Sequence, residues 1–210
     1  MTLLALPLVT AVGFQLVALV RGVGESRVWA EHAAATFATL ALLGLVVGRA
    51  TADSPALVYL GAALALGVLV TLAATRLGGG VWSLVAVLGA AFAHSAWAVD
   101  ATPTLPALLA LFVSVAVFVF WPFAAHPRLA NDAWCWRAAA LAGAAWFVAL
   151  GTCWEERFGD AAIGLMPLLL GGLTLAAAAR VRRLFDVDDA LQRTRLAWLL
   201  GMTLAFVTVA

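Results

Sequence analysis

The sequence consists of apolar segments, each about as long as a membrane is thick, separated by short polar breaks. Only 11% of the residues are charged, whereas 65% are hydrophobic. An ordinary soluble domain has about 25% charged and about 45–50% apolar residues. A globular core cannot absorb the excess, because a chain of 210 residues must still cover that core with polar surface. Lipid can replace this surface, so the sequence indicates an integral membrane protein.

Eight segments are long enough to cross a bilayer as helices, which takes about 20 mostly apolar residues. Charged residues, glycine or proline mark the breaks, and the alternation typical of barrel strands is absent from the sequence. We therefore expect an all-α, polytopic transmembrane helix bundle of about eight spans, which forms a single domain over residues 1–210. The expected spans are 2–20, 28–48, 56–75, 80–99, 104–125, 133–153, 161–180 and 191–210.

The twelve basic residues, all arginine, are unevenly divided between the two sides of this bundle. One side carries only Arg49 and Arg157, and the other carries Arg21, Arg27, Arg76, Arg128, Arg137, Arg180, Arg182, Arg183, Arg193 and Arg195. Short loops rich in arginine stay in the cytoplasm. This predicts both termini on the non-cytoplasmic side of a bacterial inner membrane. A cleaved signal peptide is not expected, because no basic segment precedes the first span.

Glu31, His32 and Arg137 form the candidate intramembrane polar site. Glu31 and His32 lie about one turn inside span 28–48, and Arg137 lies about one turn inside span 133–153, from the same side. Ionisable groups inside a span are costly and often functional. The alternatives are snorkelling of each side chain to the interface, which is the commoner arrangement, and an ion pair between Glu31 and Arg137. A proton or substrate site is the third.

The sequence predicts no catalytic residues, no metal site and no cofactor. It lacks a nucleotide-binding loop, a zinc-binding helix motif and a nucleophile elbow. His94 lies roughly 14 Å from His32 in depth, so these two with His126 cannot form one metal site, and we expect His94 to be a packing residue. Cys135 and Cys153 would lie about 27 Å apart on one helix. That separation is too large for a disulfide between them, which needs about 7 Å.

Arg180, Arg182 and Arg183 are the candidate contacts for anionic lipid head groups. The alternative is that these arginines serve only as a topology signal. On the other side, we expect the acidic residues of 155–160 to lie in a solvated loop. Tryptophans near the expected span ends, Trp97, Trp136 and Trp154 among them, are placed as in an interfacial belt. Trp146 and Trp198 lie deeper, which predicts a packing role.

Two stretches near the end of the sequence resemble a known family. They are FGDAAIGLMPL at 158–168 and LAWLLGMTLAFVTVA at 196–210, separated by an Ala/Leu-rich span and an Arg-rich hinge. This part is similar to the large multi-pass bacterial predicted membrane proteins catalogued as domain of unknown function twenty-three thirty-nine. The resemblance implies no activity and no catalytic residues. Members of that family have many more spans, which implies that this chain is a fragment or a short relative.

We expect a non-enzymatic integral membrane subunit or scaffold that lies in the lipid bilayer and packs against other membrane protein subunits. The short loops, the lack of a catalytic set and small-residue faces such as Gly171-Gly172 favour this function. The alternative is a transporter, or a lipid- or glycan-handling protein, with a polar cavity lined by Glu31, His32 and Arg137. A membrane enzyme is a third possibility. A nucleic-acid partner is excluded, because the net charge is only +1 and no basic face is clustered.

The Glu31–Arg137 pair is testable by a double-mutant cycle. An unpaired charge costs roughly 2.5–3.5 kcal/mol at the bilayer centre and less near the interface, and removal of one partner would strand the other. Glu31→Gln and Arg137→Gln should each lower the melting temperature in detergent, and the double variant should lose less than the sum. Strictly additive losses would mean that both side chains snorkel independently.

Overall fold

The computed structural model describes residues 56–77, 80–100, 102–124, 132–185 and 190–210. Within these residues all regular structure is helical, which confirms the all-α prediction for this part of the chain. The expected spans 2–20 and 28–48 lie outside the described residues. The elements are α3 (Ala56–Leu77), α4 (Val81–Asp100), α5 (Leu105–Ala124), α7 (Ala133–Ala145), α8 (Phe147–Phe158), the 3₁₀ helix η1 (Asp160–Ala162), α9 (Leu165–Leu184) and α10 (Ala190–Val209).

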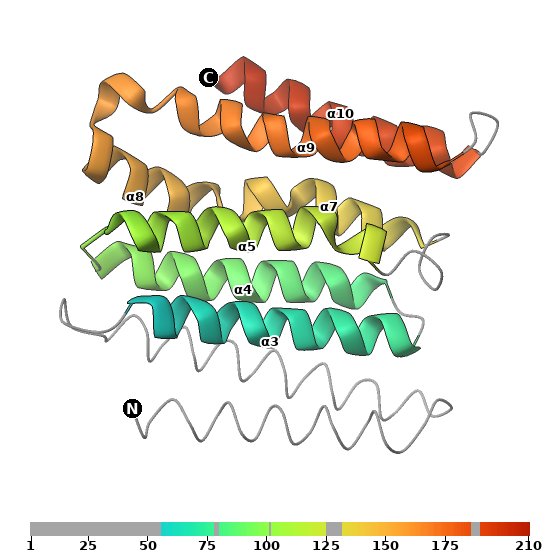
Figure 1. Ribbon diagram of the computed structural model, residues 1–210, viewed down its shortest axis with the longest axis horizontal. Helices are drawn as coiled ribbons and strands as arrows, with labels where there is room; N and C mark the ends of the chain where they lie inside the picture. The colour runs from blue at the N-terminus through green and yellow to red at the C-terminus, as the bar shows by residue number, and fades with distance from the viewer. Residues whose placement is uncertain (1–55, 78–79, 101, 125–131, 186–189) are drawn as a thin grey trace.

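The long helices lie side by side with alternating direction, and α7 and α8 together form one interrupted rod (Figure 1). Four stretches of the described chain are long and apolar enough to cross a membrane: Val81–Val99, Leu105–Ala124, Ala133–Phe158 and Asp160–Leu184. The described part of α3 adds a shorter apolar stretch, Ala56–Leu72. α10, at the eighth expected span, contains Gln192, Arg193 and Arg195 in its first turns and is not among these four stretches.

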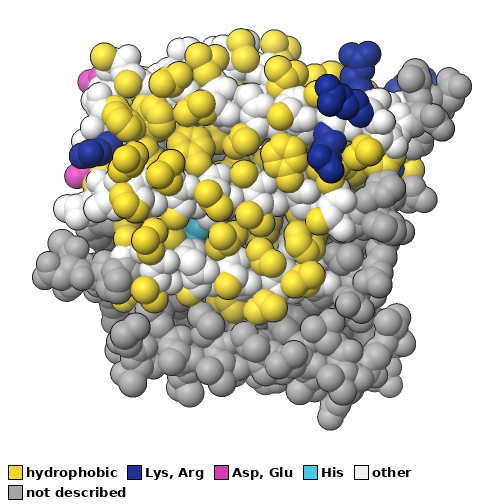
Figure 2. Space-filling model, in the orientation of Figure 1, with side chains coloured by type: hydrophobic (Ala, Val, Ile, Leu, Met, Phe, Trp, Pro, Cys, Tyr) yellow, Lys and Arg dark blue, Asp and Glu magenta, His cyan; other side chains and the backbone are white. Residues whose placement is uncertain are grey.

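The two ends of the described bundle carry different charges (Figure 2). Basic side chains gather at the end where α7 begins, α9 ends and α10 begins, and we call this the arginine-rich end. At the opposite, acidic end, α8 and η1 carry Glu155, Glu156 and Asp160 beside Arg157. This separation agrees with the arginine distribution along the sequence.

The structure corrects the expected loop at 155–160. α8 continues through Glu155, Glu156 and Arg157 to Phe158, so the sixth expected span is longer than predicted. Glutamate and arginine are good helix formers, so charge alone does not end a helix. The helix ends at Gly159, whose φ of 73° lies in the region that favours glycine.

The seventh expected span, 161–180, is displaced along the chain. Residues 160–162 form η1 instead, and Trp154 fixes this turn against α8 by donating its Nε1–H to the Ala162 carbonyl at 2.8 Å. α9 therefore begins only at Leu165. At its other end it continues past Arg180 to Leu184, where basic side chains in the last turn interact favourably with the helix dipole.

Small side chains let α10 pack closely on α9, which is its most extensive contact among the described helices. A Cβ added at Gly171 would lie 3.6 Å from the Thr203 carbonyl oxygen and 3.5 Å from Cβ of Phe206. The Thr174 and Thr203 hydroxyls form a hydrogen bond of 2.8 Å across the same contact. Close backbone approach and interhelical hydrogen bonds are the main forces that join helices in lipid.

Asp132 joins the first turns of α7 and α4 at the arginine-rich end. Its Oδ1 accepts from the Trp134 N–H at 2.8 Å, and its Oδ2 accepts from the Gly80 N–H at 2.8 Å. A Cβ at position 80 would overlap the carboxylate, so only glycine permits this approach. One side chain thus satisfies a free N–H group at the beginning of each of two helices.

Loss of this carboxylate should therefore lower the free energy of unfolding more than loss of a single helix cap does. Asp132→Ala should lower the free energy of unfolding by about 1–2 kcal/mol, the upper part of the range for N-cap removal, because two N–H groups lose their acceptor. The measurement is unfolding in mixed SDS and mild detergent, followed by circular dichroism. Glu156→Ala, at an exposed position of α8, is the control. Equal stability of the two variants would contradict the double cap.

Candidate functional site

His94 of α4 is a deeply buried ionisable side chain of the described bundle, with 1% of its surface exposed. Its Nδ1 accepts a hydrogen bond of 2.7 Å from the Trp146 Nε1–H. Because indole nitrogen only donates, His94 Nδ1 must be the unprotonated nitrogen. Nε2 therefore carries the proton of the neutral ring and donates it to the Leu60 carbonyl of α3 at 3.0 Å.

Trp146 lies at the break between α7 and α8 and is fully buried. Its φ of −87° lies in the right-handed helical region, but its ψ of −1° departs from the α-helical value of about −42°. The backbone hydrogen bonds nevertheless continue, since its N–H donates to the Ala142 carbonyl at 3.2 Å and its carbonyl accepts from Leu150 N–H at 2.9 Å. Its ring centroid lies 5.4 Å from that of Phe118 on α5. One side chain at the helix break therefore contacts both α4 and α5.

This geometry makes His94 a packing residue. Both of its ring nitrogens are engaged, so neither is free to bind a metal ion or haem iron. No group of three His, Cys, Asp or Glu side chains in the described part of the chain could hold a metal ion. Cys135 and Cys153 are buried free thiols on α7 and α8.

Arg137 is the one member of the candidate polar site that the structure describes. Its guanidinium lies 4.8 Å from the ring centroid of Trp134 and 5.6 Å from that of Trp198. A cation over aromatic faces is stabilised by their negative π-surfaces. Glu31 and His32 lie outside the described residues, so their pairing with Arg137 stays a prediction.

The candidate head-group contacts Arg180, Arg182 and Arg183 are exposed on the last turns of α9. The Arg180 guanidinium lies 5.3 Å from the ring centroid of Phe123. This placement at the arginine-rich end is compatible with contact to anionic head groups, which stays a prediction.

The tryptophans show what sequence spacing alone misses. Trp97, Trp136 and Trp154 lie near helix ends, as expected, but they are buried and face other helices instead of lipid. Trp198, expected to pack inside, is 36% exposed, whereas Trp146 does pack inside, as predicted. Position in the sequence gives depth in the membrane, but the facing of a side chain depends on how the helices are arranged.

Two concave surfaces were not predicted from the sequence, and the first is the outward face of α10. Ala197, Gly201 and Ala205 follow at intervals of four residues, and all three are exposed. Ala197, Trp198, Gly201 and Met202 line a hollow of about 250 Å³. A Cβ added at Gly201 would have no neighbour within 4 Å. The interval of four between small residues was the available signal, because it places them on one side of a helix.

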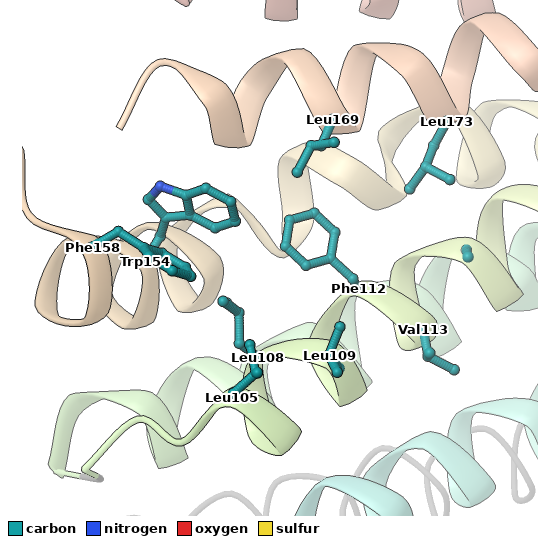
Figure 3. A pocket seen from close by; sticks show the side chains of 10 residues that line it. Leu105, Leu108, Leu109, Phe112, Val113, Trp154, Phe158, Leu169 and Leu173 are labelled. Atoms are coloured by element: carbon teal, nitrogen blue, oxygen red, sulfur yellow. The ribbon is translucent and has the colours of Figure 1, made fainter. Parts of the chain in front are cut away.

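An apolar groove between α5, α8 and α9 is the second (Figure 3). Its volume is about 530 Å³. α5 contributes one wall through Leu109, Phe112 and Val113, and α9 contributes the other through Leu169 and Leu173. Trp154 and Phe158 of α8 close the acidic end.

Comparisons with protein-family models, with curated proteins and with solved structures find no match. The resemblance of the last part of the chain to the large multi-pass family therefore stays a prediction.

Removal of the indole N–H at the helix break should destabilise the bundle. Trp146→Phe leaves the buried His94 Nδ1 without a donor, and an unsatisfied buried group costs about 1–3 kcal/mol. The double variant with His94→Phe and Trp146→Phe should lose less free energy of unfolding than the two single variants lose together, because both lose the same hydrogen bond. Circular dichroism during SDS-induced unfolding measures both.

Trp198→Phe is the matched control, because it makes the same change at a tryptophan on the bundle surface. A Trp146→Phe variant no less stable than this control would contradict the role of the hydrogen bond.

Proposed function

We propose that this chain is a non-enzymatic, multi-pass subunit of a bacterial inner membrane that packs against another membrane protein through α10. The observation that carries the proposal is the exposed stripe of Ala197, Gly201 and Ala205 around the hollow on α10. Helices in lipid associate by close packing at such small residues, since lipid tails are as apolar as leucine and provide no hydrophobic drive. The opposite side of α10 already packs on α9 in this way at Gly171.

The occupant that fits this face is a transmembrane helix with small residues and a carboxylate near the arginine-rich end. Arg193 is exposed and lies one interval of four before Ala197, so it continues the same stripe. A second copy of this chain, related by a two-fold axis along the membrane normal, would bring two Arg193 side chains together. Like charges at an interface are unfavourable, whereas a carboxylate on a different protein complements the arginine.

The proposal includes the topology. With spans 2–20 and 28–48 added, and with α3 and α10 counted as spans beside the four long apolar stretches, the chain has about eight spans. The arginine-rich end lies in the cytoplasm, because short arginine-rich loops are retained there. Both termini then lie on the other side.

The alternative, a transporter or a lipid- or glycan-handling protein with a polar cavity, has less support. The Arg137 guanidinium is stacked on Trp134 and Trp198. Both nitrogens of His94 are engaged in packing. Arg137 and His94 are therefore already in contact with side chains of the described bundle.

Two glycine substitutions test the partner face. Gly201→Leu should fill the hollow on α10 and disrupt the complex, whereas Gly172→Leu should leave it intact. The two sites are matched, because each is an exposed glycine in a helix and an added Cβ has no neighbour within 4 Å at either. The measurement is the mass of the complex extracted from native membranes in mild detergent, with its subunits identified by mass spectrometry.

We expect a wild-type complex that contains this chain and a second, different membrane protein at fixed stoichiometry. It should dissociate in Gly201→Leu and persist in Gly172→Leu. A complex of the same mass in both variants, a monomeric wild-type protein or an assembly of identical chains would each overturn the proposal.

A further inference from the structure

The groove between α5, α8 and α9 differs from the α10 face in the size of the side chains at its rim. Leu109, Val113 and Leu169 are 56%, 54% and 44% exposed at its edges, whereas Trp154, at 6%, is buried behind them. Figure 2 shows the surrounding face covered mainly by hydrophobic side chains. The groove is therefore concave, wholly apolar in its lining and open toward the region where lipid would lie.

The groove spans one leaflet in depth. Its lining on α5 begins at Leu105, the first residue of that helix at the acidic end, and continues to Ala116. Eleven residue steps of about 1.5 Å give a length of about 16 Å. Half of a hydrocarbon core of about 30 Å is about 15 Å. The groove thus runs from one membrane interface to the middle of the bilayer.

Trp154 and Phe158 mark the interfacial end of the groove. Their ring centroids lie 4.7 Å apart, and Phe112 meets Trp154 edge-on with centroids 6.0 Å apart. The only polar atom of the Trp154 side chain is already used, because Nε1–H donates to the Ala162 carbonyl. The small exposed part of Trp154 is therefore apolar and offers an occupant no hydrogen bond. A polar head group would lie beyond this end, outside the groove.

The rim fits a second protein helix less well than it fits a hydrocarbon chain. Helices approach one another in lipid where small residues line the contact, as on α10. Here the projecting Leu109, Val113 and Leu169 would hold a helix backbone away, and Ala116 is the one small residue in the lining. A thin, flexible hydrocarbon chain can pass between these side chains. The volume of about 530 Å³ lies within the range of about 300–1,000 Å³ that is usual for small-molecule sites.

We propose that this groove binds one acyl chain of a membrane phospholipid as a resident ligand. The chain lies lengthwise between Phe112 and Leu173, with its carboxyl end at Trp154 and its methyl end at Ala116. The site is on helices other than α10, so it is independent of the subunit contact proposed above.

Native mass spectrometry of the protein, extracted from its membranes in mild detergent, tests the occupancy. One phospholipid per chain should remain bound to the wild type. Ala116→Phe should lower this occupancy by about tenfold, because the ring displaces the methyl end of the chain from apolar contact. Ala176→Phe makes the same change at an exposed position of α9 outside the groove and should retain the lipid.

A second measurement keeps the test valid if Ala116→Phe folds poorly. The wild type is reconstituted in vesicles of phosphatidylethanolamine and phosphatidylglycerol that contain a phospholipid with a diazirine near the acyl methyl end. After illumination, adducts should concentrate on α5 and α9 around Ala116 and Leu173. Equal labelling of all lipid-facing helices, a free fatty acid or a protein segment in the groove, or equal lipid retention by the two phenylalanine variants, would overturn the proposal.

Discussion

The hydrogen bond from Trp146 to His94 joins the described helices at a point where lipid could not satisfy either group. Inside a bilayer, a polar side chain without a partner costs several kcal/mol, so it must find one within the protein. The indole N–H, the imidazole and the Leu60 carbonyl form a chain in which the donors and acceptors all match. This chain connects α3, α4 and the break between α7 and α8. α8 follows directly after this break, and its Trp154 and Phe158 close one end of the groove beside α5 and α9.

The two concave surfaces are both apolar, but they differ in the size of the side chains that line them. On α10 the residues Ala197 and Gly201 have small or no side chains, so the helix backbone lies close to the surface there. Along α5 and α9 the side chains project, and the space lies between them at Leu109 and Leu169. A rigid helix complements the first surface and a flexible chain complements the second. Hydropathy alone cannot make this distinction, because it treats alanine, leucine and valine as variants of one property.

The sequence predicts the described helices well where lipid thickness decides their length. Span 104–125 corresponds to α5 within one residue at each end. Pro103 and Thr104 lie directly before the first residue of α5 and mark where this helix begins. It fails at 155–160, where charged residues continue α8 until Gly159 ends it. The sequence also did not predict the break at Trp146, because no proline marks it.

For the candidate sites, too, the sequence predicts the depth of a residue but not its partners on other helices. The sequence identified Arg137 from its depth, and the structure adds the indole rings of Trp134 and Trp198, which lie one turn away and on another helix. It treated His94 as a packing residue on the basis of its depth, but the partners Leu60 and Trp146 are 34 and 52 residues away in the chain. Contacts between distant residues depend on the rotation of each helix about its axis. That rotation is fixed by packing among all the helices, so no local pattern contains it.

Two arginines of α10 at the arginine-rich end differ in their surroundings, and this difference bears on where the proposed partner lies. Arg195 is buried, with its guanidinium 4.1 Å from the ring centroid of Phe185 and 5.2 Å from that of Trp136. The aromatic faces there stabilise a cation that is withdrawn from water. Arg193, two residues earlier on α10, is exposed and follows the line of Ala197 and Gly201. In the contact proposed above, close helix packing along that line would desolvate Arg193, and a carboxylate of the partner at this depth would offset that cost. In that proposed contact, the small residues would set how near the partner helix lies, and the arginine would set which helix is accepted.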